Sequence, residues 1–223
     1  MNKLKLLFKK LLHLLVGYFI MATGICLSVK SHIGLGPWDV LNEGLSKVTD
    51  ISYGLINIYI SIIVIMIACC IKIFPGIGTL LNALCFGIMI DFILPFINVS
   101  DNIFIQLMMA LLGIILLAFG SAVYLMVDFG AGPRDSLLLG LVLKLKKDTT
   151  FVKPVLEAIV LIIGFIIGGT VGIGTLMSLF LLGYFMDVFF RLFKFDPKTT
   201  KQMNFYDQYL YIKGGFFNEN SNT

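Results

Sequence analysis

The sequence has few charged residues for its length. Only 13% of its residues are Asp, Glu, Lys or Arg, whereas 58% are hydrophobic. Soluble domains carry about 25% charged and about 45–50% apolar residues. One aqueous core cannot bury this much apolar surface, so lipid must be the solvent for most of the chain.

Residues that build metal, disulfide or catalytic sites are also scarce. The four cysteines lie in apolar runs without CxxC spacing, and the two histidines have no acidic or cysteine neighbours in sequence. We therefore expect no disulfide, metal site or cofactor, and no enzyme activity. A GxxxxGK[ST] nucleotide-binding motif is absent, so direct use of ATP would need another chain.

Six long apolar stretches remain, each near the roughly 20 residues that a membrane-spanning helix needs. They predict an all-α membrane protein, because strands in lipid would leave open edges unsatisfied. The expected spans are about 11–29, 53–73, 79–97, 103–127, 152–170 and 174–195. A basic N-terminal segment over 1–10 and a polar, partly disordered tail over 196–223 flank them; the alternative for the tail is an interfacial segment anchored by its tyrosines.

The distribution of Lys and Arg predicts the orientation. With the N-terminus in the cytoplasm, only Lys30 and Lys47 of the 17 basic residues lie outside, which is a strong positive-inside bias. Both termini are thus expected in the cytoplasm, with the lipid bilayer as the first partner. Topology explains the net charge of +4, so no nucleic-acid partner is expected.

The chain repeats itself when it is shifted by 96 positions without a gap. The motif GLGPWD, which begins at Gly34, falls on GAGPRD, which begins at Gly130. Each copy, 11–97 and 103–195, holds three spans, so the second copy must enter the membrane in the opposite orientation. The matched positions that we consider candidates for a substrate or ion pathway are Gly34, Gly36, Pro37 and Asp39 with Gly130, Gly132, Pro133 and Asp135; Gly76, Gly78 and Thr79 with Gly172, Gly174 and Thr175; and Asp91 with Asp187.

A short helix is predicted after the first and the fourth span. Pro37 suits the first turn of a helix over 37–47, and Asp39 can cap its N–H groups. This helix is either a re-entrant half-helix or an amphipathic surface helix. The second copy is more apolar and is expected to be buried. Its Arg134 either contacts an anion or merely follows the positive-inside rule.

The GIGT motifs open the third and sixth spans, with Thr79 and Thr175 as candidate caps. Asp91 and Asp187 follow deep in these spans, where acids usually face a polar cavity or a partner. Asp91 is a candidate proton or cation site; a structural hydrogen bond to a neighbouring helix is the alternative. Asp187 is expected to form a salt bridge with Arg191, one turn later. Glu157 is expected at the membrane interface.

The motifs GLGPWDVL and PGIGTLLNA, followed by a third span that carries an Asp, resemble the YczE branch of the YczE/YyaS/YitT family of bacterial membrane proteins. The resemblance covers about residues 11–195. It implies a bacterial inner-membrane protein, with transport suspected for the family.

Inverted repeats are typical of transporters, which bind substrate near the midplane between the repeats. We therefore expect a secondary transporter or permease for a small molecule or ion. The alternative is a non-transporting membrane subunit that positions or regulates a partner protein, with the basic fourth connection and tail as docking elements. A homo-oligomer or a membrane partner is possible in either case.

Overall fold

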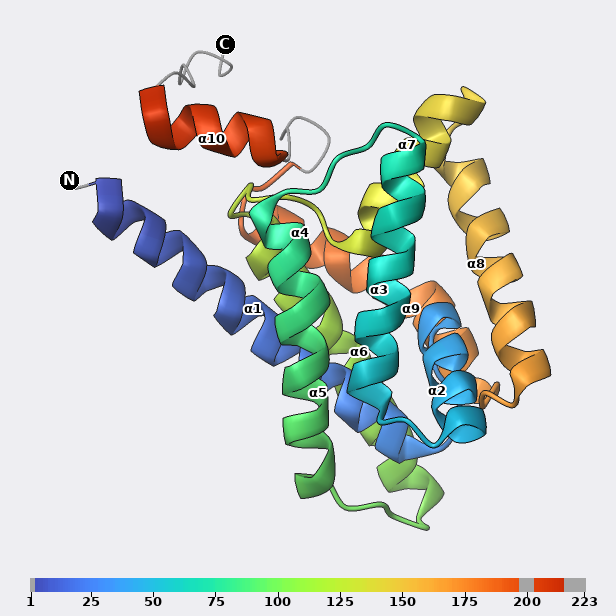
Figure 1. The fold of residues 1–223 in the computed structure, drawn as a ribbon. Coiled ribbons are helices and arrows are strands. Elements are labelled where there is room, and N and C mark those ends of the chain that lie inside the picture. Colours follow the sequence, from blue (N-terminus) through green and yellow to red (C-terminus); the bar gives the residue numbers. More distant parts are fainter. Residues whose placement is uncertain (1–2, 197–202, 215–223) are drawn as a thin grey trace.

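The computed structural model describes residues 3–196 and 203–214, and these residues form helices and connecting loops without any strand (Figure 1). Six helical stretches are long and apolar enough to cross a membrane, as the sequence predicted. They cover Leu7–Ser31, Tyr53–Cys70, Ile77–Phe96, Ile103–Leu125, Thr149–Ile167 and Ile173–Leu192.

The first half of the chain contains α1 (Lys3–Ser31), α2 (Pro37–Thr49) and α3 (Tyr53–Cys70), followed by a broken helix. The broken helix consists of α4 (Ile77–Leu81), the π-helix η1 (Asn82–Phe86), α5 (Gly87–Ile93) and the 3₁₀ turn η2 (Leu94–Phe96). The second half contains α6 (Ile103–Leu125), α7 (Pro133–Leu145), α8 (Thr149–Ile167) and α9 (Ile173–Leu192), and α10 (Phe205–Gly214) follows it. The basic segment predicted for 1–10 is not separate, because α1 is helical from Lys3.

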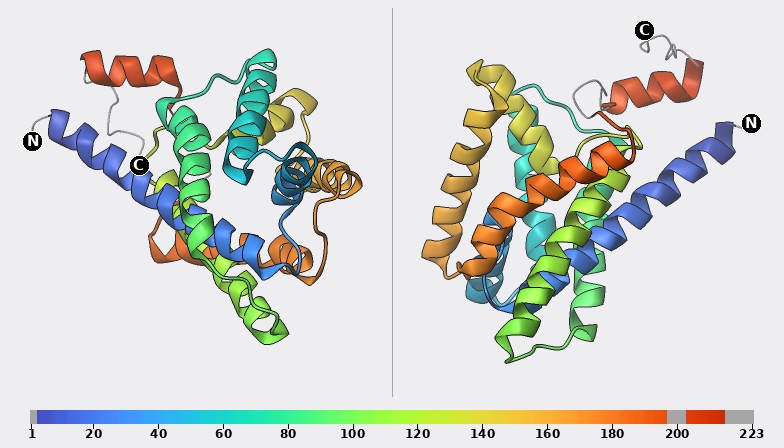
Figure 2. Two further views of the ribbon diagram at one scale, coloured as in Figure 1. Left: turned by 60° about the horizontal axis from the view of Figure 1, so that its bottom comes forward. Right: turned by 180° about the vertical axis from the view of Figure 1, so that it is seen from behind.

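The helix starts of the two halves keep the register of 96. Pro37 opens α2 and Pro133 opens α7, and 133 − 37 = 96; Ile77 and Ile173 open α4 and α9 with the same difference. The halves interlock, because α2 packs on α8 of the second half and α7 packs on α3 of the first. Figure 2 shows α1 and α6 crossing beside each other.

Four glycines allow the backbones of α1 and α6 to approach closely. A Cβ added to Gly24 would lie 2.6 Å from the carbonyl oxygen of Gly113, and one added to Gly120 would lie 2.7 Å from that of Gly17. Small residues at such crossings are the usual means of packing helices in lipid.

Two short backbone contacts tie the halves together beside this crossing. The N–H of Gly78 donates to the carbonyl of Phe129 at 2.7 Å, and the N–H of Gly174 donates to the carbonyl of Ile33 at 2.8 Å. The two contacts are related by the register of 96. Each one joins the start of a late helix in one half to the GxGP loop of the other half.

The tail differs from its prediction where the structure describes it. Residues 205–214 form α10, which lies at the same end of the molecule as the start of α1 (Figure 1). The side chain of Gln208 is 1% exposed, accepts a hydrogen bond from the Ile77 N–H at 2.8 Å and donates to the Phe129 carbonyl at 2.8 Å. This anchoring makes a freely solvated tail wrong for 203–210; residues 197–202 and 215–223 lie outside the described residues.

Candidate functional site

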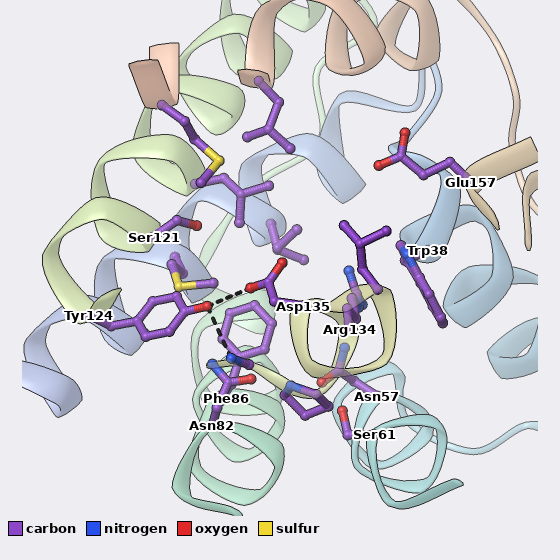
Figure 3. Close-up of a pocket in the computed structure, with 18 of the residues that line it drawn as sticks. Trp38, Asn57, Ser61, Asn82, Phe86, Ser121, Tyr124, Arg134, Asp135 and Glu157 are labelled. Atoms are coloured by element: carbon purple, nitrogen blue, oxygen red, sulfur yellow. Dashed lines mark hydrogen bonds between the residues drawn. The ribbon is translucent and has the colours of Figure 1, made fainter. Parts of the chain in front are cut away.

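A cavity of about 180 Å³ lies between the halves, bounded by α1, α2, α3, η1, α6, α7, α8 and α9. One wall is apolar, with side chains from α1, α6 and α9. The other wall is polar and includes the start of α7 (Figure 3). Its uncharged polar side chains are Asn57, Ser61, Asn82, Ser121 and Tyr124.

The GxGP loops bring the starts of α2 and α7 to this region. Gly34 and Gly130 have φ angles of +113° and +108°, a backbone conformation that glycine adopts without strain. Pro37 and Pro133 then open the helices, as predicted. Most of the first two turns of α2 is buried, which favours a re-entrant half-helix over a surface helix.

Asp39 does not cap α2 as predicted. The helix has no side-chain cap at Gly36, and the Asp39 carboxylate has other partners. Its Oδ1 accepts hydrogen bonds from both terminal nitrogens of Arg134, at 3.3 and 3.2 Å, and from the Tyr53 hydroxyl at 3.2 Å. Asp39 is only 5% exposed, so the guanidinium compensates a buried charge. Glu43 is likewise only 8% exposed, so Asp39 and Glu43 do not form the solvated face that the surface-helix alternative for α2 would need.

Asp135, the equivalent of Asp39, has a different environment. It is exposed to the cavity, and its Oδ2 accepts a hydrogen bond from the Tyr124 hydroxyl at 2.8 Å (Figure 3). The Gly132 N–H donates to the same hydroxyl oxygen at 3.3 Å. No ion pair to Asp135 is formed within the described part of the chain. Of the two equivalent acids, one is therefore neutralised by the protein and the other is open to a ligand.

The GIGT motifs lie where the two halves make their backbone contacts, through the N–H groups of Gly78 and Gly174. Thr79 and Thr175 are not the N-caps; that position belongs to Gly76 and Gly172, and α4 begins two residues and α9 one residue before the predicted spans. The threonine hydroxyls accept hydrogen bonds from the N–H groups of these glycines at 3.1 and 3.2 Å. Thr79 also donates to the Ala131 carbonyl at 2.7 Å. The motifs therefore support the site but do not line the cavity.

Asp91 lies outside the cavity lining, at the contact between α5 and the start of α3. Its carboxylate accepts a hydrogen bond from the Ser52 hydroxyl at 2.5 Å and another from the Gly54 N–H at 2.7 Å. This geometry corresponds to the structural alternative for Asp91. The salt bridge predicted for Asp187 is wrong: both Asp187 and Arg191 are exposed, and no ion pair between them occurs in the described residues.

Several cavity residues were not identified from the sequence. Lys153 and Glu157 of α8, whose charged groups lie 3.9 Å apart, line the cavity; the interfacial position of Glu157 stays a prediction. Asn57 and Ser61 are one turn apart on α3 and also face it. Isolated polar residues at helical spacing inside an apolar span were the signal that could have found them.

Comparison with known proteins places the chain in a family. The profile of DUF6198, a family of unknown function, matches residues 8–191. The chain is 32% identical over 189 residues to an uncharacterized protein of Haemophilus influenzae, covering 83% of this chain and 87% of that protein.

Two proteins of Bacillus subtilis are also similar. The uncharacterized membrane protein YczE is 30% identical over 172 residues, covering 75% of this chain and 79% of YczE. The uncharacterized protein YyaS is 31% identical over 180 residues, covering 78% and 89%. The predicted resemblance to YczE and YyaS is confirmed, and no solved structure matches the chain. With six apolar helices and this match over most of its length, the chain is a multi-pass membrane protein that belongs to the DUF6198 family.

Proposed function

We propose that the protein is a secondary transporter that moves a small polar solute through its central cavity. The observation that carries the proposal is the meeting of two equivalent half-helices, α2 and α7, whose starts are joined by Asp39 and Arg134 beside that cavity. Discontinuous helices with their N-terminal ends near the midplane form the substrate sites of many carriers.

The proposal includes an inverted arrangement of the two halves. Each half contributes three spans, and the positive-inside bias supports opposite orientations with both termini in the cytoplasm of an inner membrane. In this orientation, the contact between Ile33 and Gly174 lies toward the outer face. The contact between Gly78 and Phe129 lies toward the cytoplasm.

The two halves differ in a way that suits alternating access. In the first half, α3 packs against α5 so closely that a Cβ added to Gly54 would meet the Gly87 carbonyl oxygen. In the second half, no comparable contact joins α8 to α9. Gly183, the equivalent of Gly87, has open space around an added Cβ. In the proposed orientation, the packed pair α3 and α5 lies toward the outer side and the unpacked pair α8 and α9 lies toward the cytoplasm.

The sequence explains this difference. Asp91 is held by Ser52 and Gly54, whereas the equivalents of these two residues are Asp148 and Thr150. Asp187 would therefore meet a second carboxylate and a bulkier residue if α9 closed on α8. Ionised carboxylates repel each other at short range, so closure on this side needs a bound ligand, a proton or another compensating change.

The test combines transport with accessibility. Purified protein is reconstituted in proteoliposomes and screened for uptake and for charge movement with a broad panel of metabolites and ions. Single cysteines at Ser121 and Leu182, in a cysteine-free background, report access to the cavity from each side. We expect labelling from the cytoplasmic side that a transported solute reduces. Correctly folded protein that moves nothing, or a cavity that is labelled equally from both sides, would contradict the proposal.

A further inference from the structure

We infer that the central cavity binds its ligand through a protonated amino group, which the carboxylate of Asp135 holds. The inference rests on the proposed function only in taking this cavity as the substrate site. It adds the chemical class of the substrate.

Three oxygen atoms converge beside Gly132. A Cβ added to this glycine would lie 3.1 Å from the Tyr124 hydroxyl, 3.5 Å from Asp135 Oδ2 and 3.7 Å from Asn82 Oδ1. The Tyr124 hydroxyl hydrogen is directed at Asp135, so the carboxylate and the amide oxygen remain as acceptors on this wall. A primary ammonium carries three N–H donors and a positive charge, which such a group of oxygens can accept.

Polar side chains around this point lack partners. Asn57, Ser61, Asn82 and Ser121 are between 2% and 8% exposed and line the cavity, and none of the four has a hydrogen bond with another described residue. None of their nitrogen or oxygen atoms is among the fully buried atoms without a partner, so these groups are open to the cavity and free to bond to a ligand there. A polar ligand would supply the missing partners.

The protein itself illustrates the same chemistry at the equivalent carboxylate. Asp39 is bound by a cationic group of the chain, the guanidinium of Arg134. Asp135 has no such partner among the described residues and faces the cavity. The remaining charged pair, Lys153 with Glu157, is an ion pair of opposite signs. Among the described carboxylates that line the cavity, Asp135 is therefore the one without a cation, and the ligand is the source of the missing positive charge.

An organic amine fits the cavity better than a bare metal ion. Within the described residues, no group of three or more His, Cys, Asp or Glu side chains is placed to hold a metal. The wall opposite the polar residues is built from carbon-rich side chains, including Met21, Ile25, Leu117 and Met186. Such a wall accommodates a short carbon skeleton, as in most small-molecule sites. Anions are disfavoured because Arg134 is already committed to Asp39.

The experiment measures the thermal midpoint of the detergent-purified full-length protein with five small solutes. Ethanolamine and glycine carry a primary ammonium; tetramethylammonium has the charge without N–H donors; ethylene glycol has neither; acetate has the opposite charge. We expect a stabilising shift with ethanolamine, glycine or both, and none with the other three. Binding of glycine alone identifies an amino acid as the ligand class, and binding of ethanolamine identifies a simple amine.

The site is tested with variants. We expect Asp135→Asn to raise the dissociation constant of the stabilising amine at least tenfold. The control variant Asp101→Asn, which changes an exposed acid in a loop, should leave it unchanged. If Asp135→Asn does not fold, Asn82→Ser and Tyr124→Phe take its place, and each should weaken binding several-fold. The inference is overturned if no solute binds, if tetramethylammonium, ethylene glycol or acetate stabilises as strongly as the amines, or if the folded Asp135→Asn variant still binds normally. Uptake into proteoliposomes separates the two proposals: amine binding without uptake contradicts only the transporter, and uptake of acetate contradicts only the amine.

Discussion

Trp38 and Arg134 hold equivalent places in the two halves of the chain, and in the folded protein they touch. The guanidinium carbon of Arg134 lies 5.4 Å from the centroid of the Trp38 ring. A cation over an indole face is attracted by the ring quadrupole. The contact positions the guanidinium that neutralises Asp39. The position at which the two GxGP motifs differ most, Trp38 in one and Arg134 in the other, therefore also provides a contact between them.

Removing the guanidinium should destabilise the protein. In Arg134→Met, the buried Asp39 carboxylate keeps only the Tyr53 hydroxyl, and we expect a loss of about 3 kcal/mol. The double variant Asp39→Asn with Arg134→Met leaves no uncompensated charge and should recover more than half of this loss. A double-mutant cycle on unfolding in detergent checks the coupling. Additive effects of the two substitutions would contradict the ion pair.

Loss of the Asp91 carboxylate should loosen the contact between α3 and α5. Asp91→Ala removes the acceptor for Ser52 and Gly54, and we expect a cost of about 2 kcal/mol. Hydrogen exchange at the Gly54 amide should accelerate. The matched control is Asp187→Ala, at the equivalent position, where the exposed side chain predicts a change within about 0.5 kcal/mol. Equal effects at both positions would argue against the asymmetry of the two halves.

Two equivalent glycines test the same asymmetry by adding bulk. A Cβ in Gly87→Ala would lie 2.5 Å from the Gly54 carbonyl oxygen, and we expect overpacking to cost about 1–3 kcal/mol. Gly183→Ala meets nothing within 4 Å, so its better helix propensity should stabilise the protein by about 0.5–1 kcal/mol. Thermal midpoints of the two variants measure the difference, and shifts of the same sign would be inconsistent with it.

Stability should depend on pH through Asp128, which lies between α6 and α7. Burial raises the pKa of this carboxyl to about 6, and the nearby Lys10 opposes the rise. Because an unfolded Asp has a pKa of about 3.9, the folded state binds the proton more tightly, and stability falls as pH rises from about 4 to about 6. Asp128→Asn mimics the protonated form and tolerates the φ of 60°.

The variant should therefore be more stable than wild type above pH 6, and its advantage should fade toward pH 4. Thermal midpoints across this pH range check the sign. The exposed Asp101→Asn variant serves as the control and should show no such trend. An advantage of Asp128→Asn that grows as the pH falls would exclude the buried carboxyl as the cause.

The C-terminal helix should contribute to stability through one side chain. Gln208→Leu keeps the volume but leaves the Ile77 N–H without its acceptor, and the Phe129 carbonyl keeps only the Gly78 N–H as donor, so we expect a loss of about 1–3 kcal/mol. Tyr206→Leu, on the same helix and with a side chain that is 69% exposed, is the control and should leave the stability nearly unchanged. A thermal midpoint that is unchanged in Gln208→Leu would show that α10 does not stabilise the protein by joining the two halves.

The amino-acid sequence by itself determined the spans, the two short helices and the register between the halves. A long apolar stretch in lipid must be helical, because a helix satisfies all of its own backbone hydrogen bonds whereas an open sheet does not. The GxGP and GIGT motifs contain the glycine and proline residues that precede or begin helices, so they predict helix starts from local sequence.

Only the tertiary structure decided which polar groups meet. Whether Asp91 faces Ser52 or a cavity, whether Asp39 is bound by Arg134, and whether Glu157 lines the cavity all depend on contacts between residues distant in sequence. Periodicity reports which face of a helix is apolar, but it does not report which helix lies opposite. That choice is made by packing, and it leaves Asp39 neutralised and Asp135 open to a ligand.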